Sequence, residues 1–165
     1  MTRSAAPQID VIVESDHWSP DSETIVRRAL AQAAQSVKGD FAGRTLAVLL
    51  TDDAAVRRLN ATWRGLDKPT NVLSFPAPAN DPSQPLGDIA IAFETTAREA
   101  EAEHKSLADH LSHLSVHGFL HLVGYDHDEE RQAQEMEALE RRILEGLGVP
   151  DPYALDESPS EAARV

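Results

Sequence analysis

Three histidines between residues 117 and 127 have the spacing of a metal site. His117 and His121 are four residues apart, so on a helix they share one face and can present ring nitrogens to one ion. Gly124 follows them, and a glycine in the left-handed conformation ends a helix and turns the chain back, which would bring His127 to the same ion. Three neutral nitrogen ligands leave one tetrahedral position open, as in catalytic zinc sites. The sequence therefore predicts a metal site held by these three histidines, which suits zinc, although three imidazoles also suit nickel, copper or iron.

His113 lies four residues before His117, on the same predicted helical face. A triad of His113, His117 and His121 would spread along about 12 Å of helix, too far for one ion with metal–nitrogen distances near 2 Å. We therefore place His113 beside the site, either as a catalytic group that transfers a proton or as a hydrogen-bonded wall residue. Asp126 and Asp128 flank the third histidine, and they either orient a histidine N–H or cap the next helix.

The same histidine spacing occurs in the metzincin metallopeptidases, in which a glutamate after the first histidine is the general base. In this chain that position is Gly118, which cannot accept a proton. Peptide hydrolysis by that mechanism therefore lacks its base. Gly118 also costs the helix roughly 1 kcal/mol relative to alanine, which indicates close packing or substrate approach at this point.

The elements that must position these histidines follow from the hydrophobic pattern. Strands are expected at residues 9–14, 45–50, 71–75 and 87–93, and helices near residues 20–39, 94–104, 106–123 and 129–147. A further helix is expected to carry Val56, Leu59 and Trp63. Ser19 and Pro20 are expected to begin the first helix, and Asp52 or Asp53 the second. The proline-rich stretch 76–85 is expected to be a mobile loop. The expected fold is α+β: a small mixed four-stranded sheet covered by about five helices, with the metal-binding helix packed centrally.

The composition limits the classes of protein. A chain of 165 residues with 41% hydrophobic residues is the size of one domain, which we expect over residues 1–155, with a disordered tail at 156–165. The absence of cysteine excludes disulfides and thiolate metal sites. The first twenty residues contain no apolar segment, so we expect a cytoplasmic protein that does not bind membranes.

The charge distribution limits how this chain can contact nucleic acid. Its formal net charge of -13 argues against a broad phosphate-binding surface, so any contact with RNA must be local. One local excess of positive charge lies between residues 57 and 68. It has a net charge of +3, from four cations and one acid: Arg57, Arg58, Arg64 and Lys68 against Asp67.

Two long motifs resemble the YbeY family of single-strand-specific endoribonucleases. Residues 117–127 match the signature HGxLHLxGYDH at every fixed position, and residues 64–76 match the block R-G-x-D-K-P-T-[DN]-V-L-S-F-P. The segments Gly87-Asp88-Ile89 and Asp151-Pro152-Tyr153 also fit the family. Leu66 stands where familiar members usually have a lysine, which removes one possible phosphate contact.

The resemblance implies a function and site residues. It implies that His117, His121 and His127 are the zinc ligands and that Arg64 takes part in RNA cleavage. It also implies ribosomal RNA as the substrate, the ribosome or proteins of its small subunit as partners, and roles in 3′-end maturation of the small-subunit RNA and in ribosome quality control.

These residues suggest metal-assisted hydrolysis of a phosphodiester bond. Arg64 would bind the substrate and stabilise charge developing at the phosphate, and Lys68 would add a second positive charge. The general base is unassigned: the candidates are metal-bound hydroxide, His113, or the 2′-hydroxyl of RNA acting as an internal nucleophile. The alternatives are a non-catalytic metal-binding factor for ribosome assembly and, less favoured because of Gly118, a metallopeptidase.

Overall fold

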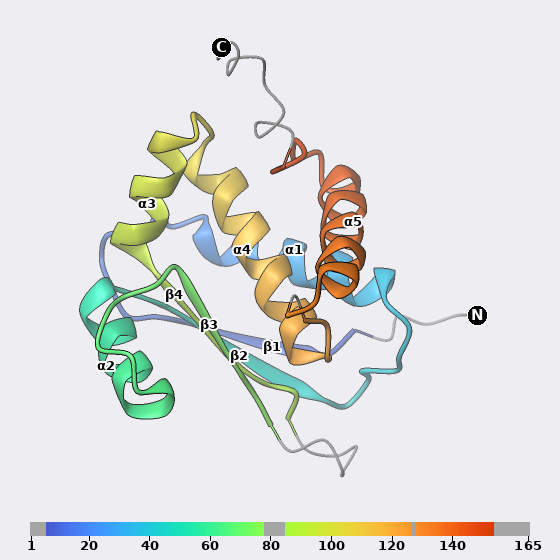
Figure 1. Ribbon diagram of the computed structural model, residues 1–165, viewed down its shortest axis with the longest axis horizontal. Helices are drawn as coiled ribbons and strands as arrows, with labels where there is room; N and C mark the ends of the chain where they lie inside the picture. Colours follow the sequence, from blue (N-terminus) through green and yellow to red (C-terminus); the bar gives the residue numbers. More distant parts are fainter. Residues whose placement is uncertain (1–5, 78–84, 127, 154–165) are drawn as a thin grey trace.

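The structure, a computed structural model, describes residues 6–77, 85–126 and 128–153. Most of the expected loop 76–85, His127 and the expected tail 156–165 lie outside these ranges. The described part of the chain forms four strands and five helices (Figure 1), in the order β1 (Gln8–Val13), α1 (Ser22–Ser36), β2 (Thr45–Thr51), α2 (Asp53–Arg64), β3 (Val72–Pro76), β4 (Gly87–Ala92), α3 (Phe93–Ala102), α4 (Leu107–Leu122) and α5 (Glu130–Gly146). The expected α+β class is confirmed.

The four strands form one mixed sheet in the order β1-β2-β4-β3. β1, β2 and β4 are parallel, and β3 pairs antiparallel with β4 at the edge of the sheet. The register places Val48 of β2 and Ser74 of β3 on either side of Ile89 in β4. Ser74 therefore belongs to the face of the sheet that Ile89 also lines.

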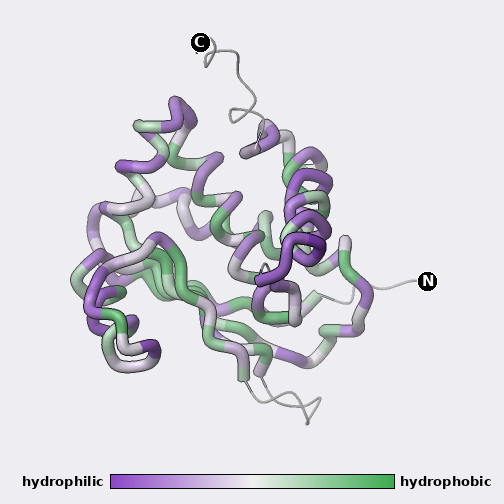
Figure 2. Tube along the Cα trace, in the orientation of Figure 1, coloured by the Kyte–Doolittle hydropathy of each residue, from purple (hydrophilic) through white to green (hydrophobic). Residues whose placement is uncertain are grey.

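The sheet separates two hydrophobic layers. α1 and α4 cover one face and α5 packs on both of them, whereas α2 packs on β3 and β4 from the other face (Figure 1). The larger core lies between the sheet and the helices α1, α4 and α5, and a smaller one, around Val56 and Leu73, lies beneath α2. Figure 2 shows the apolar strands running through the middle of the molecule. α4, the helix that carries the predicted metal ligands, packs between the sheet and the other helices, as expected.

Three helix starts test the expected N-caps. Asp52 caps α2 by accepting the backbone N–H of Ala55 at 2.9 Å, as expected. The expected start of α1 at Ser19 and Pro20 is wrong, because the Ser19 hydroxyl bonds the Asp21 carboxylate in a preceding turn and the helix begins at Ser22. Of the two roles left open for Asp126 and Asp128, capping of α5 is wrong, because Glu129 is the N-cap residue. None of the helices described is long and apolar enough to cross a membrane.

Candidate metal centre

α4 is buried on every side except along one stripe. Between residues 110 and 122 every side chain is buried except those of His113, His117 and His121, which are partly exposed. The Ser106 hydroxyl accepts the Asp109 N–H at 3.0 Å and so fixes the start of the helix. The apolar remainder of α4 packs into the larger core, so the same packing that stabilises the helix holds the histidines in line.

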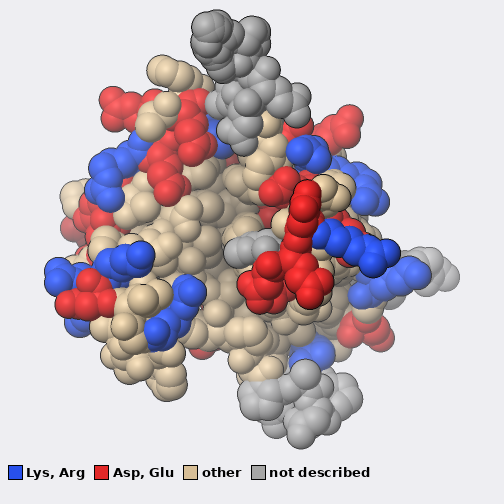
Figure 3. All heavy atoms as spheres, in the orientation of Figure 1, with Lys and Arg blue, Asp and Glu red and all other residues tan. Residues whose placement is uncertain are grey.

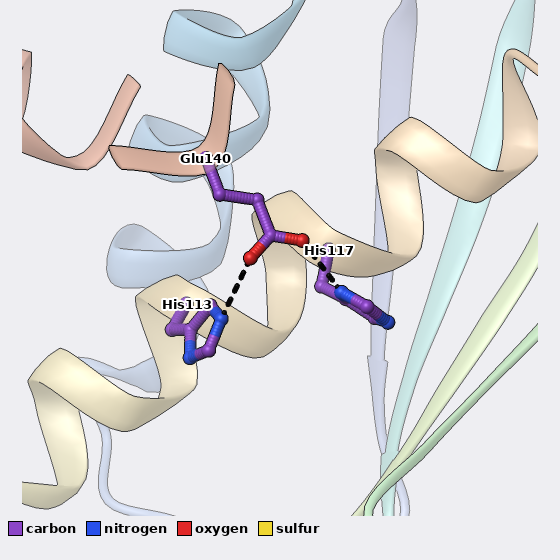
Figure 4. Close-up of side chains that lie close together, drawn as sticks. All are labelled: His113, His117 and Glu140. Atoms are coloured by element: carbon purple, nitrogen blue, oxygen red, sulfur yellow. Dashed lines mark hydrogen bonds and ion pairs between the residues drawn. The ribbon is translucent and has the colours of Figure 1, made fainter. Parts of the chain in front are cut away.

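Glu140 of α5 faces this histidine stripe from the opposite helix. Its side chain is fully buried, and its carboxylate accepts hydrogen bonds from Nδ1 of His117 at 2.6 Å and Nε2 of His113 at 3.0 Å (Figure 4). Burial acts to raise the pKa of Glu140, but the hydrogen bonds from the two histidines outweigh it, and the pKa is lowered to about 2. Glu140 is therefore an anion at neutral pH.

The charge of Glu140 determines the tautomers of the two histidines. An ionised carboxylate only accepts hydrogen bonds, so His117 carries its proton on Nδ1 and His113 carries its proton on Nε2. The lone-pair nitrogen of His117 is then Nε2, which points away from Glu140 (Figure 4). Histidines that bind metals commonly donate their other N–H to a carboxylate in this way. The Nδ1 atom of His113 is buried and has no hydrogen-bond partner among the described residues.

The second predicted ligand lies beside the first. The ring centroids of His117 and His121 are 4.7 Å apart, and the rings are close to perpendicular. α4 ends one residue later, and Gly124 has a φ of +104° while its N–H bonds the carbonyl of His121 at 3.2 Å. The expected glycine turn directly after the second histidine is confirmed, and the third predicted ligand, His127, lies outside the described residues.

His113, His117 and Glu140 form a group that could hold a metal ion, because one ligand atom from each lies within 4.8 Å of the others. Two of these contacts, at 2.6 and 3.0 Å, are hydrogen bonds. Two ligands of a tetrahedral zinc ion with bonds near 2.1 Å are about 3.4 Å apart, so an ion between them would require the side chains to separate. The observed distances fit Glu140 better as the group that orients the histidines than as a ligand.

Tyr153 holds Glu140 from the carboxyl-terminal side. Its hydroxyl donates to Oε1 of Glu140 at 2.5 Å. Burial and the neighbouring carboxylate raise the pKa of Tyr153, so its phenol stays protonated and remains a donor. Arg141 lies 5.3 Å from the centroid of the Tyr153 ring and pairs with Asp151 at 3.2 Å. The segment around Tyr153 is thereby fixed against α5.

The family model of Endoribonuclease YbeY matches residues 9–148 of this chain. The chain belongs to the YbeY family. Similar curated proteins named Endoribonuclease YbeY include that of Bradyrhizobium diazoefficiens, 55% identical over 93% of this chain and 89% of that protein, and that of Nitrobacter winogradskyi, 56% identical over 93% and 86%. A solution structure of a Thermotoga maritima protein has the same fold, with a TM-score of 0.60 and 25% identity over 84% of this chain and 87% of that one. The resemblance drawn from the two motifs is confirmed, and with it the expectation of an enzyme of the endoribonuclease class.

Glu140 and Tyr153 were not predicted as site residues of this YbeY-family protein. Glu140 is fully buried, unlike most acids on a surface helix. The sequence spacing indicates the burial of Glu140. It follows Met136 by four residues and precedes Ile143 by three, so it belongs to the buried stripe of α5. An acid on an apolar stripe requires a buried partner, and here the partners are the histidines of α4.

The basic residues of the second YbeY motif are Arg64, at the end of α2, and Lys68, in the segment after it. α2 packs on the face of the sheet opposite to α4 (Figure 1). Arg64 ends α2 and is exposed, and it lines a groove that Ser74 of β3 also lines. Lys68 is exposed as well, and its carbonyl accepts the side-chain amide of Asn60 at 2.9 Å. In the part of the chain that the structure describes, neither cation bonds a histidine of α4. Ser74 links β3 to α4, because its hydroxyl donates to the Gly118 carbonyl at 3.0 Å.

Proposed function

We propose that this protein is a zinc-dependent, single-strand-specific endoribonuclease that matures the 3′ end of the small-subunit ribosomal RNA and takes part in ribosome quality control. The observation that carries the metal-dependent part is the buried Glu140 carboxylate behind His117, which sets the tautomer that a metal-binding histidine needs. Membership of the YbeY family supports RNA as the substrate. The ribosomal role rests on the family resemblance.

His117, His121 and His127 are the proposed ligands of one Zn²⁺ ion. The imidazole donors and the acidic partner behind His117 fit zinc, which binds neutral histidine nitrogens. A zinc ion held by these residues would supply Lewis-acid chemistry, polarising a phosphoryl oxygen or activating a water molecule. The chain itself supplies orientation: Glu140 fixes the His117 ring, and Tyr153 fixes Glu140.

Arg64 and Lys68 are the proposed substrate-binding residues. The guanidinium of Arg64 can donate two parallel hydrogen bonds to phosphate oxygens and so stabilise charge that develops during cleavage. Lys68 adds a point charge on the same surface. The general base is unassigned: His113 or a water activated at the metal site would accept the proton, or the substrate 2′-hydroxyl would act as an internal nucleophile. Cleavage of RNA but not of the same sequence as DNA would favour the 2′-hydroxyl.

The proposed function is tested with a labelled single-stranded RNA and zinc-loaded protein. His121→Ala is compared with the unchanged protein and with His17→Ala, which alters an exposed histidine far from the stripe in the sequence. We expect His121→Ala to abolish cleavage while its circular dichroism stays that of a folded protein, and His17→Ala to cleave normally. Equal cleavage by all three proteins would show a contaminating nuclease and overturn the proposal.

A second candidate is a metal-binding ribosome assembly factor that does not cleave RNA. The observation in its favour is that Glu140 joins α4, α5 and the segment around Tyr153, so the site also connects parts of the fold. In that case His121→Ala would unfold the protein rather than remove an activity from a folded one. Circular dichroism of the variant distinguishes the two.

Packing opposes the metallopeptidase alternative. A Cβ atom added at Gly118 would lie 3.0 Å from Cγ2 of Ile89 and 3.2 Å from Oγ of Ser74. Position 118 therefore faces the sheet, so the peptidase general base has no room there. The expectation of close packing at this glycine is confirmed.

The proposed biological partners are ribosomal RNA and the small ribosomal subunit. An acidic chain repels long RNA except where positive charge is concentrated, so we expect weak RNA binding by the isolated protein. Protein contacts on the ribosome would then supply the missing affinity. Tight RNA binding that persists at high salt would contradict this expectation.

A further inference from the structure

Trp63 is the most exposed large hydrophobic side chain among the described residues. The apolar stripe of α2 begins with Val56, which is fully buried, continues with Leu59, which is partly buried, and ends with Trp63, which is 69% exposed. Folding of the domain therefore leaves most of this indole in water. A large aromatic surface left in water beside a groove is typical of a binding site.

The groove beside Trp63 has the size and lining of a ligand site. It lies between α2 and the edge strand β3 and has a volume of about 710 Å³, within the range of ordinary ligand pockets. Two aromatic residues, Trp63 and Phe75, and the aliphatic Leu59 line it. Its polar lining includes Arg64, which stands next to Trp63 in the sequence.

The groove borders the strand that supports the metal helix. Ser74 lines the groove, and its hydroxyl donates to the carbonyl of Gly118 at 3.0 Å. Gly118 follows His117 directly. A ligand in the groove is therefore separated from the histidine helix by a single strand, β3.

The lining of the groove carries one cation, Arg64, and one acid, Asp88, and further positive charge lies on α2 and the segment after it. Arg58, Arg64 and Lys68 are exposed on α2 and the segment after it, and none of them forms an ion pair among the residues described. Arg57 is partly neutralised by Asp67 at 2.7 Å. Figure 3 shows blue side chains over α2, at the left, beside a largely uncharged central surface. This local positive charge contrasts with the net charge of -13 of the whole chain, and it would attract the phosphates of a nucleic-acid strand to the side of the groove formed by α2.

We propose that this groove is a stacking subsite for an unpaired nucleobase of the RNA substrate, with Trp63 as the stacking platform and Arg64 beside the adjoining phosphate. The inference rests on the proposed function, because it takes the substrate to be RNA. Aromatic faces bind bases of single strands independently of sequence. Bases inside a duplex are covered by their neighbours, so the subsite supplies a physical basis for preferring single strands.

The test is binding of a fluorescent, uncleavable 2′-O-methyl oligonucleotide to the full-length zinc-loaded protein. Trp63→Ala is compared with Trp63→Phe, which keeps an aromatic face, and with Ile12→Ala. Ile12 is a matched control because it is 47% exposed but lies on β1, at the opposite edge of the sheet. We expect roughly 5- to 100-fold weaker binding for Trp63→Ala, a small change for Trp63→Phe and none for Ile12→Ala.

An abasic oligonucleotide of the same length separates stacking from attraction to phosphate. We expect Trp63→Ala and the unchanged protein to bind the abasic strand equally. Unaltered binding of the base-bearing strand by Trp63→Ala would overturn the proposal. So would a variant that loses association with purified small ribosomal subunits but binds free RNA normally, because the groove would then dock a protein.

Intrinsic fluorescence gives a second reading of the same contact. The chain has two tryptophans, and Trp18 is 5% exposed with its indole N–H bonded to the Thr51 carbonyl at 2.9 Å. The oligonucleotide should therefore quench the tryptophan fluorescence of the unchanged protein but not that of Trp63→Phe.

Failure of this subsite is distinct from failure of the proposed function. If the unchanged protein cleaves RNA and Trp63→Ala cleaves it with the same KM, only the subsite is overturned. Absence of cleavage by the unchanged protein would overturn the function itself.

Discussion

Nδ1 of His117 lies 2.6 Å from Oε2 of Glu140, so a ring on α4 is held by a buried anion on α5. The hydrogen bond fixes both the tautomer and the rotation of the imidazole. It also couples the position of α5 to the candidate metal site.

Replacement of Glu140 by glutamine tests this orientation. The amide keeps the shape of the side chain but loses the charge. Only one of its two terminal atoms is an oxygen, so it can no longer accept one hydrogen bond from each histidine on a separate atom. We expect zinc affinity to fall 10- to 100-fold, measured by competition with a chromogenic chelator. The control is Glu145→Gln, an exposed acid on the same helix. Unchanged zinc affinity in Glu140→Gln would show that the carboxylate does not orient a ligand.

Metal content distinguishes the two possible ligand sets. If His117, His121 and His127 hold the ion, His121→Ala should lose bound zinc and His113→Ala should retain it. Inductively coupled plasma mass spectrometry of dialysed protein gives the stoichiometry directly. The opposite result, loss in His113→Ala and retention in His121→Ala, would assign the ion to the group that contains Glu140.

Arg64→Ala tests the proposed phosphate contact. We expect cleavage of single-stranded RNA to fall by roughly 10²-fold or more, in the range seen when one charge-stabilising donor is removed from an active site. We also expect the slope of log affinity against log salt to decrease by about one. Arg28→Ala is a suitable control, because Arg28 is exposed on α1, across the sheet from α2. A loss of cleavage with an unchanged salt slope would mean that Arg64 acts without contacting phosphate.

The fold was more predictable than the site because its signals are local. Alternation and helical periodicity located the strands and helices, and Gly124 marked the end of α4. The partners of the histidines depend on how α5 packs against α4, which no local pattern contains, so Glu140 was missed. Trp63 shows the converse limit: its spacing with Val56 and Leu59 continues an apolar stripe, but the helix extends beyond the core and leaves the indole exposed.

Gly118→Val tests the close packing of α4 on the sheet. Even a Cβ atom at this position lies 3.0 Å from Ile89, which is fully buried and cannot move into solvent. We expect valine to lower the free energy of unfolding by about 1–3 kcal/mol through overpacking, measured by urea denaturation. Gly118→Ala should cost less, because alanine regains roughly 1 kcal/mol of helix propensity. Equal stability of Gly118→Val and the unchanged protein would contradict the packing observed here.

His110 makes stability depend on pH. Its ring is 3% exposed, and burial lowers its pKa more than the bond to Glu99 at 2.8 Å raises it. In the unfolded chain the same ring takes up a proton near pH 6.5, so the unfolded state binds more protons below that pH. The stability that His110 contributes is therefore present above pH 6.5 and is lost as the pH falls towards the lowered pKa. The slope from this one group is at most about 1.4 kcal/mol per pH unit.

His110→Gln separates this effect from the titration of other groups. Glutamine can donate to Glu99 but does not titrate, so the variant should lose less stability than the unchanged protein between pH 7 and pH 5, in urea denaturation of zinc-free protein. His17→Gln, at an exposed histidine, should keep the slope of the unchanged protein. If His110→Gln keeps that slope as well, the folded and unfolded states take up this proton alike, and burial does not govern the charge of His110.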